Sequence, residues 1–400
     1  MLFLYLLSLS LVLLLASKGS VCVILGFRHA FCLQLDRSSF IFIITLLQIS
    51  FSVLVWSYYY IDNTPSYRTF VSLVLFFLFS ICGLVVSADL LSLFVFWDLL
   101  GFSSLFLVFY YRTRGRISAG LLTGLTNRIG DCLLLGYFCA CIYSSDAILC
   151  VGAFTLMTIA ITKSAQVPFS AWLPAAMLAP TPVSALVHSS TLVTAGVYLL
   201  YRFSSHLIPE LLYIGIFTTV ISGLAAPVQP DFKKIIALST LSQLGLIIST
   251  LGLNLRTLCF AHLNLHASFK ALLFIAVGVM IHTVYGSQGF RIMGTKLRSS
   301  SLIGTAFTVS CLSMCGLFCL SGWCSKESIL SSSYNSYFSF FTVFGFYAGM
   351  VLTVAYCVRL LCHASNVSSC HIAMTSVCSV TLFVKIPIIV LCFLSITQGI

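Results

Sequence analysis

Charged residues are scarce in this chain. Only 7% of its 400 residues are charged, and only nine residues are acidic, whereas a soluble domain carries roughly a quarter charged residues. By contrast, 60% of the residues are hydrophobic. The shortage of polar sequence excludes a sizeable soluble domain, and with it a nucleotide-binding or metal-binding domain. The net charge of +11 is scattered over helix ends and short loops, which indicates contact with anionic lipid headgroups and not with nucleic acid.

The cysteines lack a ligand pattern. None of the 17 lies at a repeated ligand spacing. Pairs such as Cys139 and Cys141 or Cys311 and Cys315 lie in apolar runs without histidines at zinc-finger spacing. We interpret them as buried free thiols. We expect neither a metal nor a cofactor in this chain.

Apolar stretches of spanning length occupy most of the sequence. A membrane-crossing helix takes about 20 apolar residues, so the chain is expected to be an all-α polytopic membrane protein of about 13 transmembrane helices. The apolar N-terminus is interpreted as a first span and not as a cleaved signal. The expected ranges are 2–17 (extending as far as 26), 38–60, 69–88, 90–111, 118–143, 148–166, 184–203, 209–228, 232–252, 256–284, 301–330, 337–362 and 376–397.

Two of these spans are expected to be interrupted. Between residues 168 and 182 lie four prolines, of which Pro168 and Pro174 come first. Each proline removes an amide donor and clashes with the preceding turn. Non-helical backbone at membrane depth is tolerated only inside protein or beside a hydrated cavity, so a transport site is expected here. A second, weaker break is expected between Gly316 and Ser325, at Gly322.

Ionisable residues occur inside the apolar stretches. A charge at the bilayer centre costs at least about 2.5–3.5 kcal/mol on insertion scales, so these side chains are expected to face one another or water. The carboxylates are Asp98, Asp131 and Glu327, and the bases are Arg128, Lys163, Lys270, Lys326, Lys385, His188, His262, His266 and His282.

Asp98 and Lys163 are expected to approach each other. Lys163 lies close before Pro168, which frees a backbone carbonyl near the lysine. A lysine whose carboxylate partner can approach or withdraw is a switchable proton carrier. A static buried ion pair that holds two helices together explains the same residues equally well.

His262, His266 and Lys270 recur at four-residue spacing, which places them on one stripe of a helix. Such a stripe favours proton transfer, because histidine exchanges protons near neutral pH. A metal site is the rival interpretation for the histidine pair, but Lys270 lies next to it and no carboxylate lies nearby in the sequence. Satisfied core histidines are the third interpretation. If protons move, we expect one polar axis from Lys163 past His188 and this stripe to Lys326 and Glu327.

The two halves of the chain show the same order of features. In each half an ionisable group in a regular span precedes a lysine in an interrupted one, which is typical of internally repeated transporters. We predict two inverted five-helix repeats with two interrupted helices. The expected units are N-terminal helices over 1–88, a first repeat over 89–205, a second over 206–362, and a C-terminal helix over 363–400.

Ordered motifs over roughly residues 85–360 resemble a known family. They are Asn127-Arg-Ile-Gly-Asp131, Lys163-Ser-Ala-Gln-Val-Pro-Phe-Ser-Ala-Trp-Leu-Pro, Ala179-Pro-Thr-Pro-Val-Ser-Ala-Leu-Val-His188, Asp231-Phe-Lys-Lys, His266-Ala-Ser-Phe-Lys270 and Ser325-Lys326. This run resembles the antiporter-like subunit 5 of NADH:quinone oxidoreductase, respiratory complex I. Related multisubunit cation/proton antiporters carry similar motifs and remain the alternative. A structural membrane spacer that keeps the motifs without conducting protons is the third.

The resemblance implies a role for each matched residue. Asp98 stands where the family usually has a glutamate paired to the Lys163 position, and Arg128 with Asp131 matches its Arg/Asp pair. His188 matches the histidine after the broken segment. His262, His266 and Lys270 match the central relay, and Lys326 matches the second broken helix, with Glu327 where an aspartate is common. Leu178 and Phe318 depart from the pattern, replacing a frequent acidic residue and a helix-breaking proline.

The resemblance also implies a setting. We expect a proton-translocating subunit in the mitochondrial inner membrane, in contact with lipids and with other membrane-arm subunits, above all the subunit 4 homologue. NADH, FMN, iron–sulfur clusters and ubiquinone are expected in other subunits. One N-terminal span and the long lateral helix of the family are expected to be absent.

Overall fold

The computed structural model describes residues 21–25, 31–61, 67–111, 113–143, 149–203, 209–284, 286–289, 301–318, 320–335, 340–365 and 381–398. The span expected over 2–17 and the start of the one over 376–397 lie outside these residues. In chain order the elements are β1 (Val21–Leu25), β2 (Phe31–Leu35), α2 (Arg37–Tyr60), α3 (Tyr67–Val86), α4 (Leu90–Phe109), α5 (Arg114–Tyr143), α6 (Leu149–Lys163), α7 (Trp172–Ala176), α8 (Thr181–Val183), η2 (Ser184–Thr191), α9 (Leu192–Phe203), α10 (Glu210–Ala225), η3 (Ala226–Val228), α11 (Phe232–Gly252), α12 (Arg256–Thr283), α14 (Ser301–Cys315), α15 (Ser321–Asn335), α16 (Phe340–Ser365) and α17 (Leu382–Thr397).

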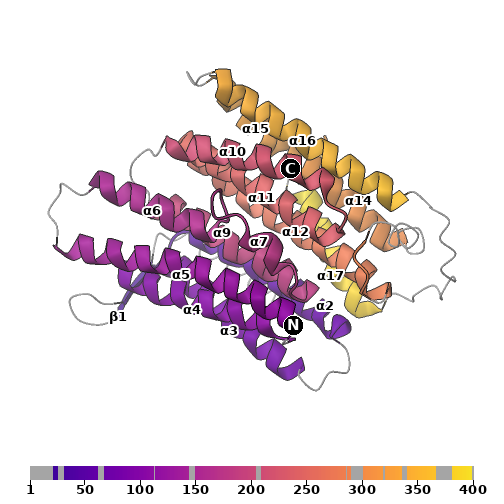
Figure 1. Ribbon diagram of the computed structural model, residues 1–400, viewed down its shortest axis with the longest axis horizontal. Coiled ribbons are helices and arrows are strands. Elements are labelled where there is room, and N and C mark those ends of the chain that lie inside the picture. Colours follow the sequence, from indigo (N-terminus) through magenta and orange to yellow (C-terminus); the bar gives the residue numbers. More distant parts are fainter. Residues whose placement is uncertain are drawn as a thin grey trace.

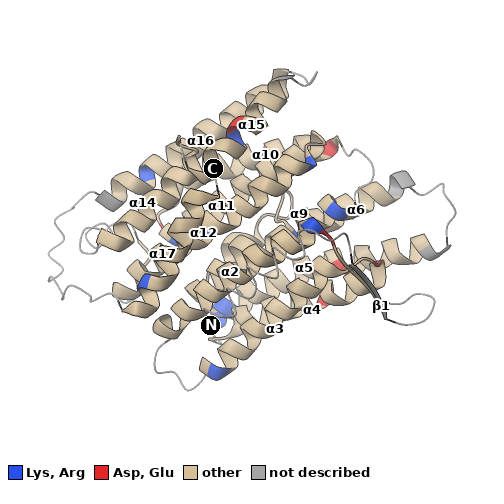
Figure 2. Ribbon diagram, turned by 180° about the vertical axis from the view of Figure 1, so that it is seen from behind, with Lys and Arg blue, Asp and Glu red and all other residues tan. Residues whose placement is uncertain are grey.

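The prediction of a polytopic helical membrane protein is confirmed. Among the described residues, eight helical stretches are long and apolar enough to cross a membrane, and three apolar helices are shorter. Helix α5 was also predicted to be a span, and it is 30 residues long. Helix α5 is not among the eight long apolar helices. It carries four charged residues, Arg114, Arg116, Arg128 and Asp131. Few of the described residues along the ribbons are charged (Figure 2).

A short hairpin departs from the all-helical expectation. β1 pairs antiparallel with β2, with Val21 opposite Leu35. The expectation that the first span extends as far as residue 26 is wrong for residues 21–25, which form β1. Apolar β-branched residues such as those of β1 suit a strand as well as a helix. Asp89 accepts a hydrogen bond from the backbone amide of Cys32, at 3.1 Å, and so ties the hairpin to the start of α4.

The first helix break follows Lys163. α6 ends there, and regular helix resumes only with the five residues of α7. Ala165 has a φ of 58°, a left-handed conformation that a residue with a Cβ seldom adopts. Pro168 lies in the non-helical stretch, whereas Pro174 lies inside α7. Pro174 is therefore not itself a point of interruption, because the first turn of a helix tolerates proline.

The second break lies slightly earlier than expected. α14 ends at Cys315 and α15 begins at Ser321. Gly316 has a φ of 78°, so it makes the turn that glycine permits. Gly322, predicted to be the break, lies in the first turn of α15. A Cβ on Gly322 would stand 1.9 Å from the backbone oxygen of Ser313, so this glycine permits close packing of α15 on α14.

The most buried helices run through the middle of the molecule. Figure 1 shows α9, α11 and α12 between α3–α6 on one side and α14–α16 on the other. Within each of the segments 181–203 and 232–252 an 18-residue stretch is entirely buried, and within 256–283 such a stretch is buried almost entirely. They nevertheless carry many polar side chains, including His188, Gln243 and Lys270. In a membrane protein such side chains face the bundle interior and indicate function.

Candidate functional site

Lys163 occupies the last position of α6 and is fully buried. Its Nζ donates a hydrogen bond to the backbone oxygen of Trp97, at 2.9 Å, and lies 4.4 Å from the centroid of the Trp97 ring. One turn further along α4, a Cβ on Gly101 would stand 3.7 Å from Nζ. The ammonium is therefore held by a carbonyl and an aromatic face, and both interactions favour the charged form.

Asp98 lies within electrostatic range of Lys163, but the two form no ion pair in the described structure. Asp98 instead forms an ion pair with Arg128 of α5. The same guanidinium lies 3.2 Å from the carboxylate of Asp131. Arg128 thus stands between both carboxylates, and its side chain is partly exposed, as is that of Asp98. Asp131 is buried, and its Oδ1 has no hydrogen-bond partner in the described structure.

Side chains replace the backbone hydrogen bonds lost at the break after Lys163. Gln166 donates to the backbone oxygen of Ser164 at 3.1 Å, and Trp172 Nε1 donates to that of Thr162 at 3.0 Å. Gln166 also accepts a hydrogen bond from Thr218 of α10, at 2.5 Å. Gln166 thus provides a hydrogen-bond donor for the backbone carbonyl of Ser164, near Lys163. These contacts fix the unwound backbone, since an unpaired buried polar group costs about 1–3 kcal/mol.

His188 lies in the π-helical segment η2, where a wider helical turn is inserted between α8 and α9. Such segments frequently occur at functional sites. The ring is buried and edge-on to Trp172, at 6.2 Å between centroids. Neither ring nitrogen has a hydrogen-bond partner in the described structure. Lys233 lies within electrostatic range of the ring and is itself buried, with its Nζ donating to the backbone oxygen of Ala179.

His262, His266 and Lys270 lie on α12, and all three are fully buried. His262 contacts Ser325 of α15 at 2.9 Å and Gln243 of α11 at 3.3 Å through its two ring nitrogens. Lys270 donates to Ser239 of α11, at 2.6 Å. Among the described residues, neither nitrogen of His266, which lies between them, has a hydrogen-bond partner. The interpretation of satisfied core histidines fits His262, whose two ring nitrogens both have polar partners.

Lys326 and Glu327 point to different sides of α15. Lys326 is buried, and its Nζ donates to the backbone oxygen of Met314, near the end of α14. The expectation that Glu327 lies on the same buried axis is wrong, because its side chain is exposed. Successive residues on a helix are about 100° apart, so one of two neighbours faces outward.

The structure brings the predicted residues into three groups. The first contains Lys163, Asp98, Arg128 and Asp131, the second His188, and the third His262, His266, Lys270 and Lys326. Within the described part of the chain, no hydrogen bond links one group directly to the next. Helix α12 packs against η2, so the second and third groups are on adjacent elements. The orphan nitrogens of His188 and His266 are where we expect buried water.

Sequence reasoning missed several residues of this site. Trp97 was given no role, and Lys233 appeared only within a matched motif. Gln166, Ser239 and Gln243 were not considered. A usable signal was present for the last three, because amides and hydroxyls inside lipid-spanning segments need partners.

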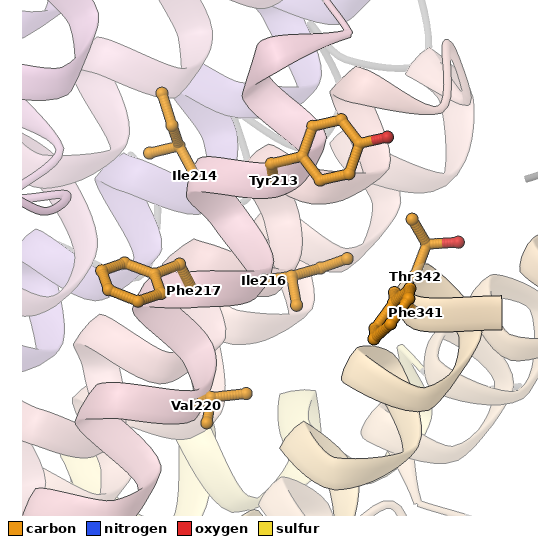
Figure 3. Close-up of a pocket in the computed structure, with 7 residues that line it drawn as sticks. All are labelled: Tyr213, Ile214, Ile216, Phe217, Val220, Phe341 and Thr342. Atoms are coloured by element: carbon orange, nitrogen blue, oxygen red, sulfur yellow. The ribbon is translucent and has the colours of Figure 1, made fainter. Parts of the chain in front are cut away.

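Within the described part of the chain, the buried lysines and histidines do not form part of a metal site. Among the described residues, no three His, Cys, Asp or Glu side chains lie close enough together to hold a metal ion. A groove of about 520 Å³ lies between α10 and α16, but its walls carry no lysine, histidine or carboxylate (Figure 3). It is lined by Tyr213, Ile214, Ile216, Phe217, Val220, Phe341 and Thr342.

Fold and site define a polytopic membrane protein with lysines and histidines buried between its central helices. Residues 87–353 match the family model described as NADH:quinone oxidoreductase/Mrp antiporter, TM. NADH-ubiquinone oxidoreductase chain 5 of Locusta migratoria is 43% identical over 83% of this chain and 61% of its own length. That of Anopheles arabiensis is 43% identical over 76% of this chain and 85% of its own length. The chain belongs to this family, among the chain 5 members, and the resemblance inferred from the motifs is confirmed.

Solved structures with the same fold come from two kinds of assembly. An Mrp complex from Dietzia superposes with a TM-score of 0.82 at 26% identity, covering 99% of this chain and 47% of that one. A membrane-bound sulfane sulfur reductase, an archaeal respiratory membrane complex, superposes with a TM-score of 0.85 at 21% identity, covering 100% of this chain and 87% of that one. The chain spans about 60% of the length of the curated relatives that match it first.

Proposed function

We propose that this chain is a proton-translocating membrane-arm subunit of respiratory complex I. In this role it couples NADH oxidation and ubiquinone reduction, carried out by other subunits, to proton transfer across the mitochondrial inner membrane. Three lysines support the proposal. Lys163, Lys270 and Lys326 are buried on three helices, and two of the three lie beside a helix break. Buried ionisable residues at unwound membrane segments are a feature of ion pathways.

In the proposed mechanism, a proton moves along the central helices between the three groups. Lys163 takes up or releases a proton as the Arg128 pair beside it shifts between Asp98 and Asp131. His188 and His266 pass the proton through buried water. Lys270 and Lys326 complete the path toward α15. NADH, FMN, iron–sulfur clusters and ubiquinone belong to other subunits in this proposal, and the subunit 4 homologue is the neighbouring partner.

The helix order supports two five-helix repeats. The series α3, α4, α5, α6 with α7, and η2 with α9 corresponds to α10, α11, α12, α14 with α15, and α16. In each series the fourth member is broken after or near a lysine. On this assignment the first repeat begins with α3, one helix before residue 89. With a span over 2–17, the proposed total remains about 13.

A multisubunit cation/proton antiporter is the second candidate, favoured by the similarity to the Mrp complex. Purification of the native complex separates the two. We expect this chain to co-purify with flavin and iron–sulfur subunits, and the complex to acidify one side of proteoliposomes upon addition of NADH. A complex without redox subunits that exchanges sodium for protons would contradict the proposal.

A further inference from the structure

The C-terminal half buries lysines without burying a carboxylate. In the N-terminal half, Asp131 is buried near Lys163. Among the described acidic residues of the C-terminal half, Glu210 and Glu327 are exposed and Asp231 is partly exposed at the start of α11. Lys270 and Lys326 therefore need another acid if protons are to pass between them.

Three thiols lie where such an acid is needed. Cys311 and Cys315 are one turn apart on α14, and Cys357 lies on α16, which packs against α14. Cys311 and Cys357 are fully buried. Cys315 directly precedes Gly316, and Gly316 lies alongside the Lys326 side chain. A Cβ on Gly316 would stand 3.2 Å from Lys326 Cδ. The three thiols are free.

The thiols are arranged in an order that joins the two lysines. Cys311 and Cys357 lie within electrostatic range of Lys270. Cys357 and Cys315 lie within electrostatic range of Lys326. Cys315 and Cys357 are in side-chain contact with each other. Tyr356, next to Cys357, contacts Ser242 of α11 at 3.2 Å, one helical turn from the Ser239 that holds Lys270.

Thiols suit an acid that must be buried in a membrane. A neutral thiol behaves as a small hydrophobic group, so its burial costs little compared with that of a carboxylate. It can still donate and accept a hydrogen bond, and it ionises far more readily than a serine hydroxyl. The cluster is also too dispersed for a metal site, since no set of three such ligands converges among the described residues.

We propose that Cys311, Cys357 and Cys315 carry the proton between Lys270 and Lys326. The S–H bond of Cys315 breaks as an N–H bond forms on neutral Lys326. Cys357 then reprotonates the Cys315 thiolate and is itself reprotonated, directly or through Cys311, by the Lys270 ammonium. One proton leaves Lys270, one arrives at Lys326, and no electron is transferred. This inference rests on the proposed function.

The test compares single variants in the assembled complex, reconstituted in proteoliposomes. Cys315→Ala and Cys357→Ala are expected to lower the protons translocated per NADH as far as Lys270→Ala does. Cys259→Ala is the matched control. Cys259 is a fully buried cysteine of α12 whose side chain contacts Thr250. It is expected to translocate as many protons per NADH as the wild type.

Three outcomes would overturn the thiol path. In the first, Lys270→Ala lowers the protons per NADH while both thiol variants match Cys259→Ala, which leaves the proposed function intact. In the second, the wild type moves no protons, which removes the proposed function as well. The third outcome comes from a measurement on the wild-type complex alone, which also serves if the variants do not assemble. Infrared difference spectra of the wild-type complex during turnover are expected to show a change in the S–H stretching band, and an unchanged band contradicts the proposal.

Discussion

The three buried lysines of the proposed proton path share one kind of contact. Lys163 donates to the carbonyl of Trp97, Lys270 to the hydroxyl of Ser239, and Lys326 to the carbonyl of Met314. None of the three ammonium groups forms an ion pair in the described structure. A neutral oxygen holds an ammonium less strongly than a carboxylate does. The proton can therefore leave each lysine more easily than it could leave a tight ion pair.

A substitution pair distinguishes the roles of Lys326 and Glu327. We expect Glu327→Gln to leave the protons translocated per NADH unchanged, because its side chain is exposed and lies off the buried axis. We expect Lys326→Ala to lower that number, because the buried amine is lost. The measurement is NADH-driven acidification in proteoliposomes. An equal loss in both variants would show that Glu327 belongs to the proton path.

The sequence allowed burial to be predicted, but not pairing. Lys163 and Lys270 lie in apolar stretches of spanning length, so their burial followed from length and composition. The partner of Asp98 did not follow, because the packing of α4 on α5 determines that Arg128 reaches it. Glu327 was placed wrongly because neighbouring positions on α15 were treated as one site, although they face different sides.

At the scale of elements, unwound backbone is concentrated beside the lysines. Ala165 follows Lys163 in a left-handed conformation, and Gly316 makes the corresponding turn before Lys326. A non-glycine residue in that conformation costs about 1–2 kcal/mol. The existence of the first break was predictable from its prolines. The position of the second was not, because Gly316 and Gly322 are equally permissive in sequence and only packing separates their roles.

The packing role of Gly322 leads to a prediction about assembly. Gly322→Ala would place a Cβ 1.9 Å from the backbone oxygen of Ser313, so α15 must move away from α14. We expect less of the chain to be retained in the purified complex. Gly136→Ala is the control, since a Cβ there meets nothing within 4 Å and the helix gains about 1 kcal/mol from the exchange. Equal retention of both variants, measured by subunit stoichiometry, would contradict the packing role of Gly322.

For the whole molecule, the arrangement of helices places the chemistry in the centre. α9, α11 and α12 are covered on both sides by apolar helices (Figure 1). We expect water there only where polar groups can hold it, as at the ring nitrogens of His188 and His266, which have no partner in the described structure. The family and the multi-pass helical fold were both predictable from the sequence. The hairpin of β1 and β2 was not, because short apolar runs do not distinguish strand from helix.

The central claim is that protons cross through the buried groups of this chain, and Lys270→Ala tests it most directly. The variant is incorporated into the assembled complex, and the protons translocated per NADH are measured in proteoliposomes beside Lys234→Ala. Lys234 is a partly exposed lysine that pairs with Asp231 at 3.0 Å. We predict that Lys270→Ala lowers the protons translocated per NADH and that Lys234→Ala does not. An assembled Lys270→Ala complex with an unchanged ratio would contradict the account.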